Sequence, residues 1–188
     1  MKIRCEWADN NALMQEYHDM EWGIPVHDDQ KLFEFLILES FQAGLSWSII
    51  LRKRQHFGEA FAGFDAVQVA AFDDNDVGRL MQNEKIVRNR KKIEAAINNA
   101  RCFLKIREQF GSFDKYIWQF VDFKPVVNRF ENMNELPART ELSDAIAKDM
   151  KKKGFRFVGS TVMYAHMQAT GMVNDHLTSC FMHEKCKT

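Results

Sequence analysis

A glutamate at the end of a long apolar run is the first residue whose position suggests chemistry. Glu39 follows the segment 32–38, LFEFLIL, which is apolar on most of a helix circumference. Carrying a carboxylate into the interior on such a helix is costly unless the group is paired or used. Gly44 and Trp47 follow in the same stretch. Glu39 is therefore either satisfied by nearby backbone N–H groups or part of a binding site.

Four side chains that can ligate a metal lie near opposite ends of the chain. His176 and Cys180 are spaced so that one helical turn would bring both to one ion. Cys5 and His18 form a comparable pair near the start. Together they make a Cys2His2 set of the kind that closes a tetrahedral structural zinc site. Such an ion would join the irregular N-terminal segment to the C-terminal tail.

The remaining cysteines and histidines leave this assignment open. His183 and Cys186 lie in the same tail and are competing ligands, and Cys102 is a fourth cysteine. Four cysteines could form two disulfides, but in a reducing compartment cysteines near histidines are better interpreted as metal ligands or core residues.

Composition indicates one globular domain. The 188 residues are 46% hydrophobic, with 16 Phe and 10 Met, which suffices for a sizeable core. The 26 basic and 26 acidic residues balance, so a nucleic-acid partner would need a local basic patch. No apolar run approaches the roughly 18 residues of a membrane span, and no signal peptide is predicted. We expect a cytoplasmic protein with no membrane partner.

The elements that must position these residues are predicted to be helices. Only 3 prolines and 9 glycines leave little room for an all-β design. Asp28 or Asp29 is expected to cap the apolar helix that ends near Glu39, and Ser143 to cap a later one that stops before Gly154. Residues 124–139 form the longest stretch without periodicity. The helical segments are expected at about 12–20, 29–39, 47–54, 55–62, 66–71, 74–82, 90–110, 113–123, 143–153 and 160–170.

Several motifs, taken together in this order, resemble one family. The resemblance runs from about residue 4 to residue 180 and is to the DNA-3-methyladenine glycosylase I family, enzymes of alkylation repair. The motifs are Arg4-Cys5-x-Trp7, Tyr17-His18-Asp19-x-Glu21-Trp22-Gly23, Leu38-Glu39, Gln42-Ala43-Gly44-Leu45-Ser46-Trp47, Gly154-Phe155-x-Phe157-Val158-Gly159 and Val173-Asn174-Asp175-His176.

The resemblance implies a fold and a metal. The expected fold is all-α, a helical bundle like that of the helix-hairpin-helix DNA glycosylases. Residues 1–188 would form a single glycosylase domain, in which the segments of about 1–25 and 172–188 make a small lobe tied by structural zinc. The family's zinc ligands match Cys5, His18, His176 and Cys180, and His183 and Cys186 fall outside the pattern.

The resemblance also assigns a base pocket. A DNA glycosylase must take its target base out of the stack and hold it. Trp47 offers a face for stacking, Tyr17 brings a ring with a hydroxyl, and Glu39 can accept a hydrogen bond from the exocyclic amino group of adenine. Each ring alone could equally be ordinary core. Trp7 and Trp22 could wall the pocket or pack the lobe.

The substrate's own chemistry limits what the protein must supply. Methylation at N3 leaves adenine cationic, so its bond to the sugar is weakened and it leaves as a neutral base. Glu39 is expected to act in recognition, with a further catalytic effect through electrostatics, rather than as a general base. Asp175 could be catalytic or could cap the turn at His176. No lysine can be assigned to Schiff-base chemistry, so no strand cleavage is expected.

Contacts with DNA are expected at two places. Gly44 and Leu45 would form a small wedge that fills the gap left by the flipped base, unless Leu45 simply packs inside. The segment 83–93 occupies the hairpin position, where Arg88 and Lys91 could meet phosphates. Two positions depart from the family. Glu84-Lys85 stands where a hairpin glycine is usual, and Met14 replaces an aromatic near the pocket.

These observations predict a monomeric glycosylase that releases 3-methyladenine from double-stranded alkylated DNA and leaves an abasic site. The alternative is a non-catalytic zinc-containing DNA- or base-binding protein on the same fold. A zinc deaminase is disfavoured, because the chain lacks the His-x-Glu and Pro-Cys-x-x-Cys signature.

Overall fold

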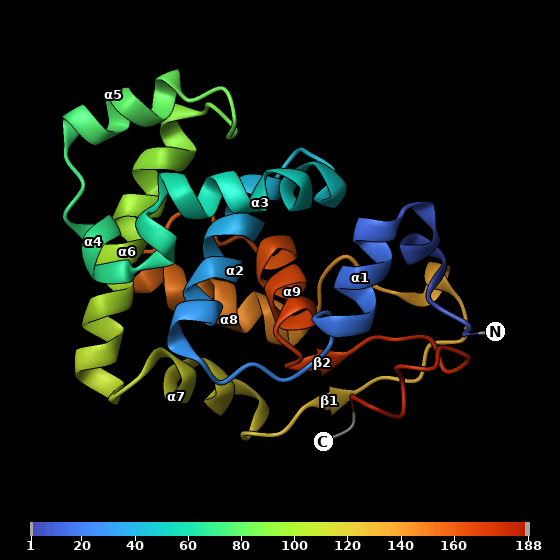
Figure 1. The fold of residues 1–188 in the computed structure, drawn as a ribbon. Coiled ribbons are helices and arrows are strands. Elements are labelled where there is room, and N and C mark those ends of the chain that lie inside the picture. Colours follow the sequence, from blue (N-terminus) through green and yellow to red (C-terminus); the bar gives the residue numbers. More distant parts are fainter. Residues whose placement is uncertain (1, 187–188) are drawn as a thin grey trace.

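Helix α2 (Asp29–Gln42) is the central element of the protein, seen here in a computed structural model (Figure 1). Asp28 is its N-cap and accepts a hydrogen bond from the Lys31 amide at 2.8 Å. All residues from Leu36 to Phe41 are buried, Glu39 among them. Helices α3, α6, α7 and α9 pack around α2, which explains why its sequence is apolar on nearly every face.

The structure describes residues 2–186, without the side chains of residues 9 and 10. The remaining α-helices are α1 (Ala12–Met20), α3 (Trp47–Ala60), α4 (Ala66–Ala70), α5 (Asp74–Gln82), α6 (Arg90–Phe110), α7 (Phe113–Trp118), α8 (Glu141–Lys152) and α9 (Ser160–Ala169). Short 3-10 helices are η1 (Glu6–Asn10), η2 (Ala62–Phe64), η3 (Gln119–Val121) and η4 (Met133–Glu135). The two strands are β1 (Val126–Val127) and β2 (Val173–Asn174).

Most helices occur where the sequence predicts them. The bounds of α1, α5 and α6 match the predicted 12–20, 74–82 and 90–110. The predicted break between 54 and 55 was wrong, since α3 runs unbroken to Ala60. The predicted cap at Ser143 was also wrong. Thr140 is the N-cap of α8, and Ser143 is the third helical residue of a capping box whose hydroxyl accepts from the Thr140 amide at 2.9 Å.

The fold was expected to be all-α, but it contains a pair of short parallel strands. Val126 pairs with Val173, and Val127 with Asn174. This pairing draws residues 126–128, from the predicted loop, onto the C-terminal tail. The predicted helix over 113–123 is correspondingly shorter, because Asp122 and Phe123 adopt positive φ values of 50° and 58° after η3. The protein is mostly helical rather than purely so.

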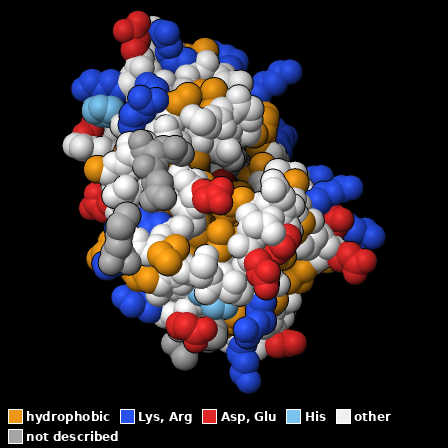
Figure 2. Space-filling model, turned by 90° about the vertical axis from the view of Figure 1, so that its right-hand side faces the viewer, with side chains coloured by type: hydrophobic (Ala, Val, Ile, Leu, Met, Phe, Trp, Pro, Cys, Tyr) orange, Lys and Arg blue, Asp and Glu red, His pale blue; other side chains and the backbone are white. Residues whose placement is uncertain are grey.

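The N-terminal segment lies beside the C-terminal segment around Phe181 (Figure 1). The Phe181 amide donates to the Ile3 carbonyl at 3.0 Å, and the Thr178 amide to the Phe130 carbonyl at 2.9 Å. Figure 2 shows the face that carries both tails, hollowed near its middle, with hydrophobic side chains gathered around the hollow. None of the helices within residues 2–186 combines the length and hydrophobicity required to cross a membrane.

Candidate functional site

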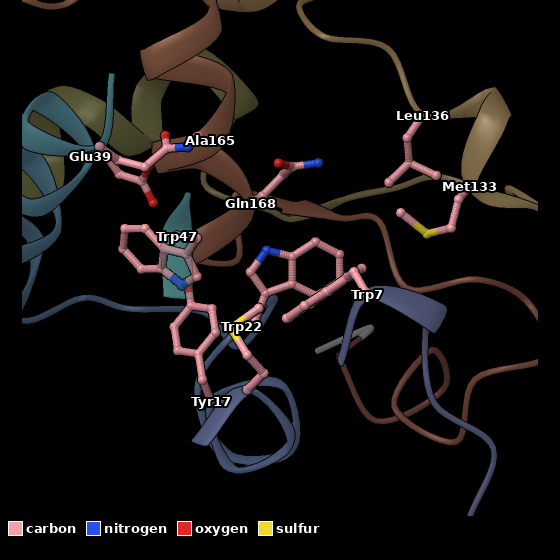
Figure 3. A pocket seen from close by; sticks show the side chains of 11 residues that line it. Trp7, Tyr17, Trp22, Glu39, Trp47, Met133, Leu136, Ala165 and Gln168 are labelled. Atoms are coloured by element: carbon pink, nitrogen blue, oxygen red, sulfur yellow. The ribbon is translucent and has the colours of Figure 1, made fainter. Parts of the chain in front are cut away.

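An aromatic-lined cavity lies between α1, the C-terminal half of α2, the start of α3 and α9. Its volume is about 290 Å³, at the small end of ligand pockets, which span roughly 300–1,000 Å³. Figure 3 shows Glu39 and Trp47 on one side of it, Met133 and Leu136 on the other, and Gln168 between them. The lining residues are Trp7, Met14, Tyr17, Trp22, Glu39, Gln42, Trp47, Met133, Leu136, Ala165 and Gln168.

Glu39 is the acidic residue of this cavity. Its side chain is carried inward near the end of α2, and the residue is only 3% exposed. Burial raises the pKa of its carboxyl group to about 8, and no hydrogen bond among the described residues offsets that effect. Of the two roles considered from the sequence, satisfaction by backbone N–H groups finds no support, and an unpaired carboxyl facing a cavity remains.

The predicted aromatic residues line the same cavity. The ring centroids of Tyr17 and Trp47 lie 5.4 Å apart, and those of Trp7 and Trp22 lie 4.9 Å apart with an interplanar angle of 75°. The indole Nε1 of Trp47 is buried without a hydrogen-bond partner among the described residues. Met14, which replaces an aromatic, also lines the cavity and is buried. The aromatic walls and one spare N–H donor suit a flat ligand with polar edges.

An ionic network that the sequence did not reveal holds the helices of the cavity together. Arg54 on α3 donates to both carboxylate oxygens of Glu21 at 2.7 and 2.8 Å, and to Glu34 on α2 at 2.7 Å. Its guanidinium also lies 5.4 Å from the ring centroid of Phe35. Because Glu21 directly follows α1, this network joins the helices that carry Tyr17, Glu39 and Trp47.

Asp175 lies in a buried hydrogen-bond network behind the cavity. Its carboxylate accepts from Asn128 Nδ2 at 2.7 Å, from the Tyr164 hydroxyl at 2.6 Å and from Gln168 Nε2 at 2.8 Å. The turn at His176 is capped instead by Asn174, whose Oδ1 accepts from the His176 amide. Asp175 is not among the cavity-lining residues, so its contacts support a role in orienting Gln168.

Gln168 and Gln42 are cavity residues that the sequence reasoning missed. Since the Asp175 carboxylate can only accept, Gln168 must turn its NH2 group toward it, which leaves the Oε1 carbonyl as the free acceptor. Ala165 and Gln168 are three apart on α9 and share a helix face, a spacing visible in the sequence. Nothing in the sequence showed that this face meets α2.

The predicted ligand set Cys5, His18, His176 and Cys180 is brought together. All four residues are buried, and one ligand atom from each lies within 4.8 Å of the others. Cys180 Sγ is 3.4 Å from His18 Nε2 and 3.6 Å from His176 Nδ1. The expected helical turn between His176 and Cys180 was wrong, because the segment is a non-helical turn.

The surroundings of this Cys/His cluster (Cys5, His18, His176 and Cys180) are those of metal ligands. His18 Nδ1 bonds Asp19 Oδ1 at 2.9 Å and His176 Nε2 bonds the Trp22 carbonyl at 3.0 Å, which leaves the other ring nitrogen of each facing the cluster. Backbone amides donate to both sulfurs at 3.4 Å. Gly23 is required nearby, because its φ is +77° and a Cβ there would lie 2.9 Å from His176 Nε2. The cluster could hold a metal ion.

The competing ligands His183 and Cys186 are not part of the Cys/His cluster. His183 Nδ1 lies 2.9 Å from the His176 carbonyl oxygen, and its own carbonyl accepts from Asn174 Nδ2. Cys102 packs in the main core, and Cys186 is buried beside the cluster without joining it.

The predicted DNA-facing residues are all at least partly exposed. Gly44 is exposed with φ +82°, and Leu45 is half-buried against the core. Arg88 and Lys91 are both exposed. Arg88 also lies 3.5 Å from Glu84.

The hairpin between α5 and α6 closes through Asn83. Its side-chain Oδ1 accepts from the Lys85 amide at 3.0 Å, and its carbonyl accepts from the Ile86 amide at 3.3 Å. Neither Glu84 nor Lys85 has a positive φ. The turn therefore needs no glycine.

Comparison with known proteins identifies the family to which this chain belongs. Residues 7–183 match the methyladenine glycosylase family. The chain belongs to that family. It is 46% identical to DNA-3-methyladenine glycosylase 1 of Escherichia coli (strain K12) over 177 residues, which are 94% of this chain and 95% of that protein.

Two solved structures of the family are similar throughout. A crystal structure of 3-methyladenine DNA glycosylase I has a TM-score of 0.93 at 47% identity, and the match covers 96% of this chain and 100% of the other. The Staphylococcus aureus 3-methyladenine DNA glycosylase I, solved to explain recognition of 3-methyladenine, has a TM-score of 0.92 at 36% identity, covering 98% and 96% of the two chains.

Glu39 predicts an unusual dependence of stability on pH. The pKa of an unperturbed Glu is 4.5, whereas the folded value is about 8. Between these values the native state keeps a proton that the unfolded chain releases, so the free energy of unfolding falls as pH rises and levels off above about pH 8. We expect Glu39→Gln to gain stability over wild type at pH 8 and little at pH 4.5, measured by urea unfolding.

Glu108→Gln, an exposed change on α6, is the matched control and should show no such trend. A Glu39→Gln stability difference that is constant across this pH range would contradict the buried, neutral carboxyl.

Proposed function

We propose that this chain flips 3-methyladenine out of double-stranded alkylated DNA into the cavity and hydrolyses its N-glycosidic bond, leaving an abasic site. The observation that carries the proposal is the aromatic cavity with a single buried carboxyl group, in a member of the methyladenine glycosylase family. The enzyme is a DNA-3-methyladenine glycosylase I.

The cavity residues divide the recognition of the base between face and edge. Trp47 stacks on the face of the purine, a contact typically contributing about 1–3 kcal/mol per base. Tyr17 adds a second ring with a hydroxyl, and Trp7 and Trp22 enclose the base. Glu39 accepts a hydrogen bond from the exocyclic amino group, which guanine lacks at that position.

The raised pKa of Glu39 suits a cationic ligand. In the empty cavity the carboxyl is mostly protonated below about pH 8. A positively charged base beside it favours the carboxylate, so the cavity would bind the cationic lesion with release of a proton. Neutral adenine offers no such charge. Glu39 therefore selects the methylated base by charge as well as by hydrogen bonding.

A carboxylate that helps to bind the cationic base does not necessarily speed cleavage of the glycosidic bond. As the glycosidic bond breaks, its electron pair moves onto the base, positive charge leaves the base and grows on the sugar, and water adds to the sugar carbon. An anion at the base edge favours the charged ground state, so it does not by itself lower the barrier. Any catalytic contribution of Glu39 must act by holding the base out of the stack in a reactive orientation.

Glu39→Gln tests this role. The variant keeps an oxygen that can accept but cannot become a carboxylate. Binding of duplex DNA that carries the cationic lesion should therefore weaken at least tenfold, through loss of a charge-assisted hydrogen bond of about 1.5–3 kcal/mol. Base release from methylated duplex should fall with it, measured in single turnover by chromatography of the released bases. Glu108→Gln is again the control.

Unchanged affinity and unchanged release in Glu39→Gln would exclude Glu39 from recognition. The same assay tests the activity itself, since a non-catalytic binding protein would release no base from the wild type. Because no lysine is expected to form a Schiff base, borohydride added during the reaction should trap no covalent protein–DNA adduct.

On the DNA side, Gly44 and Leu45 form the wedge that enters the gap, and Arg88 and Lys91 contact phosphates. The exposed, left-handed Gly44 lets the turn approach DNA closely, and Leu45 is partly exposed beside it. Wedges of this type offset the cost of unstacking a base.

Truncating the wedge separates opening of the duplex from recognition of the base. In Leu45→Ala, single-turnover release from duplex DNA should drop about tenfold while affinity for the free base stays within twofold, because the cavity is intact. Unfolding in urea must accompany the assay, since Leu45 also packs on the core. Unaltered DNA affinity and activity would show that Leu45 serves packing alone.

We also propose that the Cys/His cluster holds a structural zinc ion and ties the segments of about 1–25 and 172–188 into one lobe. The support is the donor set, its burial and the hydrogen bonds to both histidines and both sulfurs. Four protein ligands leave no open position for a substrate, so the ion supplies cross-linking only.

Metal removal should lower stability, and loss of function should accompany that loss rather than precede it. A strong chelator is expected to reduce the melting temperature by several degrees, with release of about one equivalent of zinc, and base affinity should fall in parallel. Metal analysis and thermal unfolding make the measurement. A protein that loses activity at unchanged melting temperature would point to a catalytic ion instead.

A further inference from the structure

A buried lysine contacts the wedge turn from behind. Lys92 lies in the first turn of α6 and is 7% exposed. Its ammonium donates to the carbonyl oxygens of Phe41 at 2.8 Å and Ala43 at 2.6 Å. These carbonyls belong to the C-terminal end of α2, where helix carbonyls lack partners within the helix and the dipole favours a cation.

The hairpin receives a matching contact in the opposite direction. Lys53 on α3 donates to the carbonyl oxygens of Glu84 at 3.2 Å and Lys85 at 2.9 Å. Helix α3 starts directly after the wedge turn, and α6 starts directly after the hairpin. Lys92, from the helix that follows the hairpin, therefore holds the wedge turn. Lys53, from the helix that follows the wedge turn, holds the hairpin.

Capping a helix does not require a buried ammonium. Glycine at C′ or water commonly serves, whereas burial of a charge carries a desolvation cost, seen here as a lowered pKa of Lys92. The backbone after α2 shows which carbonyls the lysine caps. Ala43 has ψ 115°, so the chain leaves the helix at once, and the turn that follows satisfies the Gln42 carbonyl through the Leu45 amide at 2.7 Å. The carbonyls of Phe41 and Ala43, on either side of it, accept from Lys92 instead.

We propose that Lys92 is a positioning residue for duplex opening, which holds the wedge turn 43–46 at a fixed place relative to the phosphate-facing hairpin. Binding of the hairpin to the backbone would then place Leu45 at the gap with no further adjustment. The inference rests on the proposed wedge. It adds that Lys92 reads no part of the DNA, yet controls where the wedge enters.

The geometry limits the effect to one step of the reaction. Lys92 touches the last turn of α2 beyond Glu39, and it is not among the residues that line the cavity. Its loss should displace the turn and leave the base pocket formed. A displacement of about 1 Å in a positioned group can cost about a hundredfold in rate.

Lys92→Met, which removes the charge and keeps most of the volume, is the test. Single-turnover release from methylated duplex should fall tenfold to a hundredfold, about 1.4–2.7 kcal/mol. Release from methylated single strands, where no duplex must be opened, and affinity for free 3-methyladenine should stay within twofold of wild type. Lys105→Met, an exposed lysine on the same helix, controls for the lost charge.

A second readout is independent of base release. A duplex carrying 2-aminopurine beside a stable abasic analogue reports unstacking by fluorescence, so it tests the inference even if the wild type releases no base from methylated DNA. Lys92→Met should give less unstacking than wild type at saturating protein. If this variant does not fold, Lys53→Met, on a less buried side chain, should show the same split.

Two results would overturn the proposal. Equal losses on duplex, on single strand and in free-base affinity would make Lys92 a structural residue only. Unchanged duplex release and unchanged unstacking would show that the wedge turn holds its place without Lys92.

Discussion

The Cys/His cluster is the constraint on which the rest of the site depends. Each half of it lies next to cavity residues in the chain. Cys5 is followed by Trp7, His18 is preceded by Tyr17, and His176 bonds the carbonyl of Trp22. The wall of the cavity that contains Trp7, Tyr17 and Trp22 is thus fixed at the points where it meets the cluster. Without that link the tails would have to be held by a small secondary core.

On the side of the cavity formed by α2, two ionisable side chains are buried near helix ends. Glu39, near the end of α2, faces the cavity, and Lys92, in the first turn of α6, lies below the turn that follows α2. The carboxyl tends to be neutral there, while the ammonium is stabilised by carbonyl oxygens. Similar desolvation thus accompanies both proposed roles, recognition of the base by Glu39 and placement of the backbone by Lys92.

Much of the site could be predicted from sequence because its signals were local or chemically rare. Glu39 stood out as a charge in an apolar run, and the Cys2His2 set as an unusual group of ligands. The residues that were missed depend on tertiary contacts. Gln168 matters because Asp175 orients it, and Arg54 because it meets Glu21 across a helix junction. The strand pair at Val126 and Val173 joins segments too distant for periodicity to connect.

Local errors had local causes. Thr140 rather than Ser143 is the N-cap of α8. The two hydroxyls belong to one capping box, so in the sequence either residue could mark the start of the helix. The hairpin without its glycine closed because an Asn side chain can imitate a turn. In each case the sequence contained the relevant residue, but the choice between two equivalent local solutions lay in the surrounding packing.

The meeting of the two chain ends also sets an order of events during synthesis. Helices α2, α3 and α6 can pack as soon as they are made, but the wall containing Trp7 and Tyr17 is fastened only when His176 and Cys180 arrive. Contacts spanning nearly the whole chain form late, because closing so long a loop carries a large entropic cost. A nascent chain would therefore acquire its core early and its capacity to hold a base last.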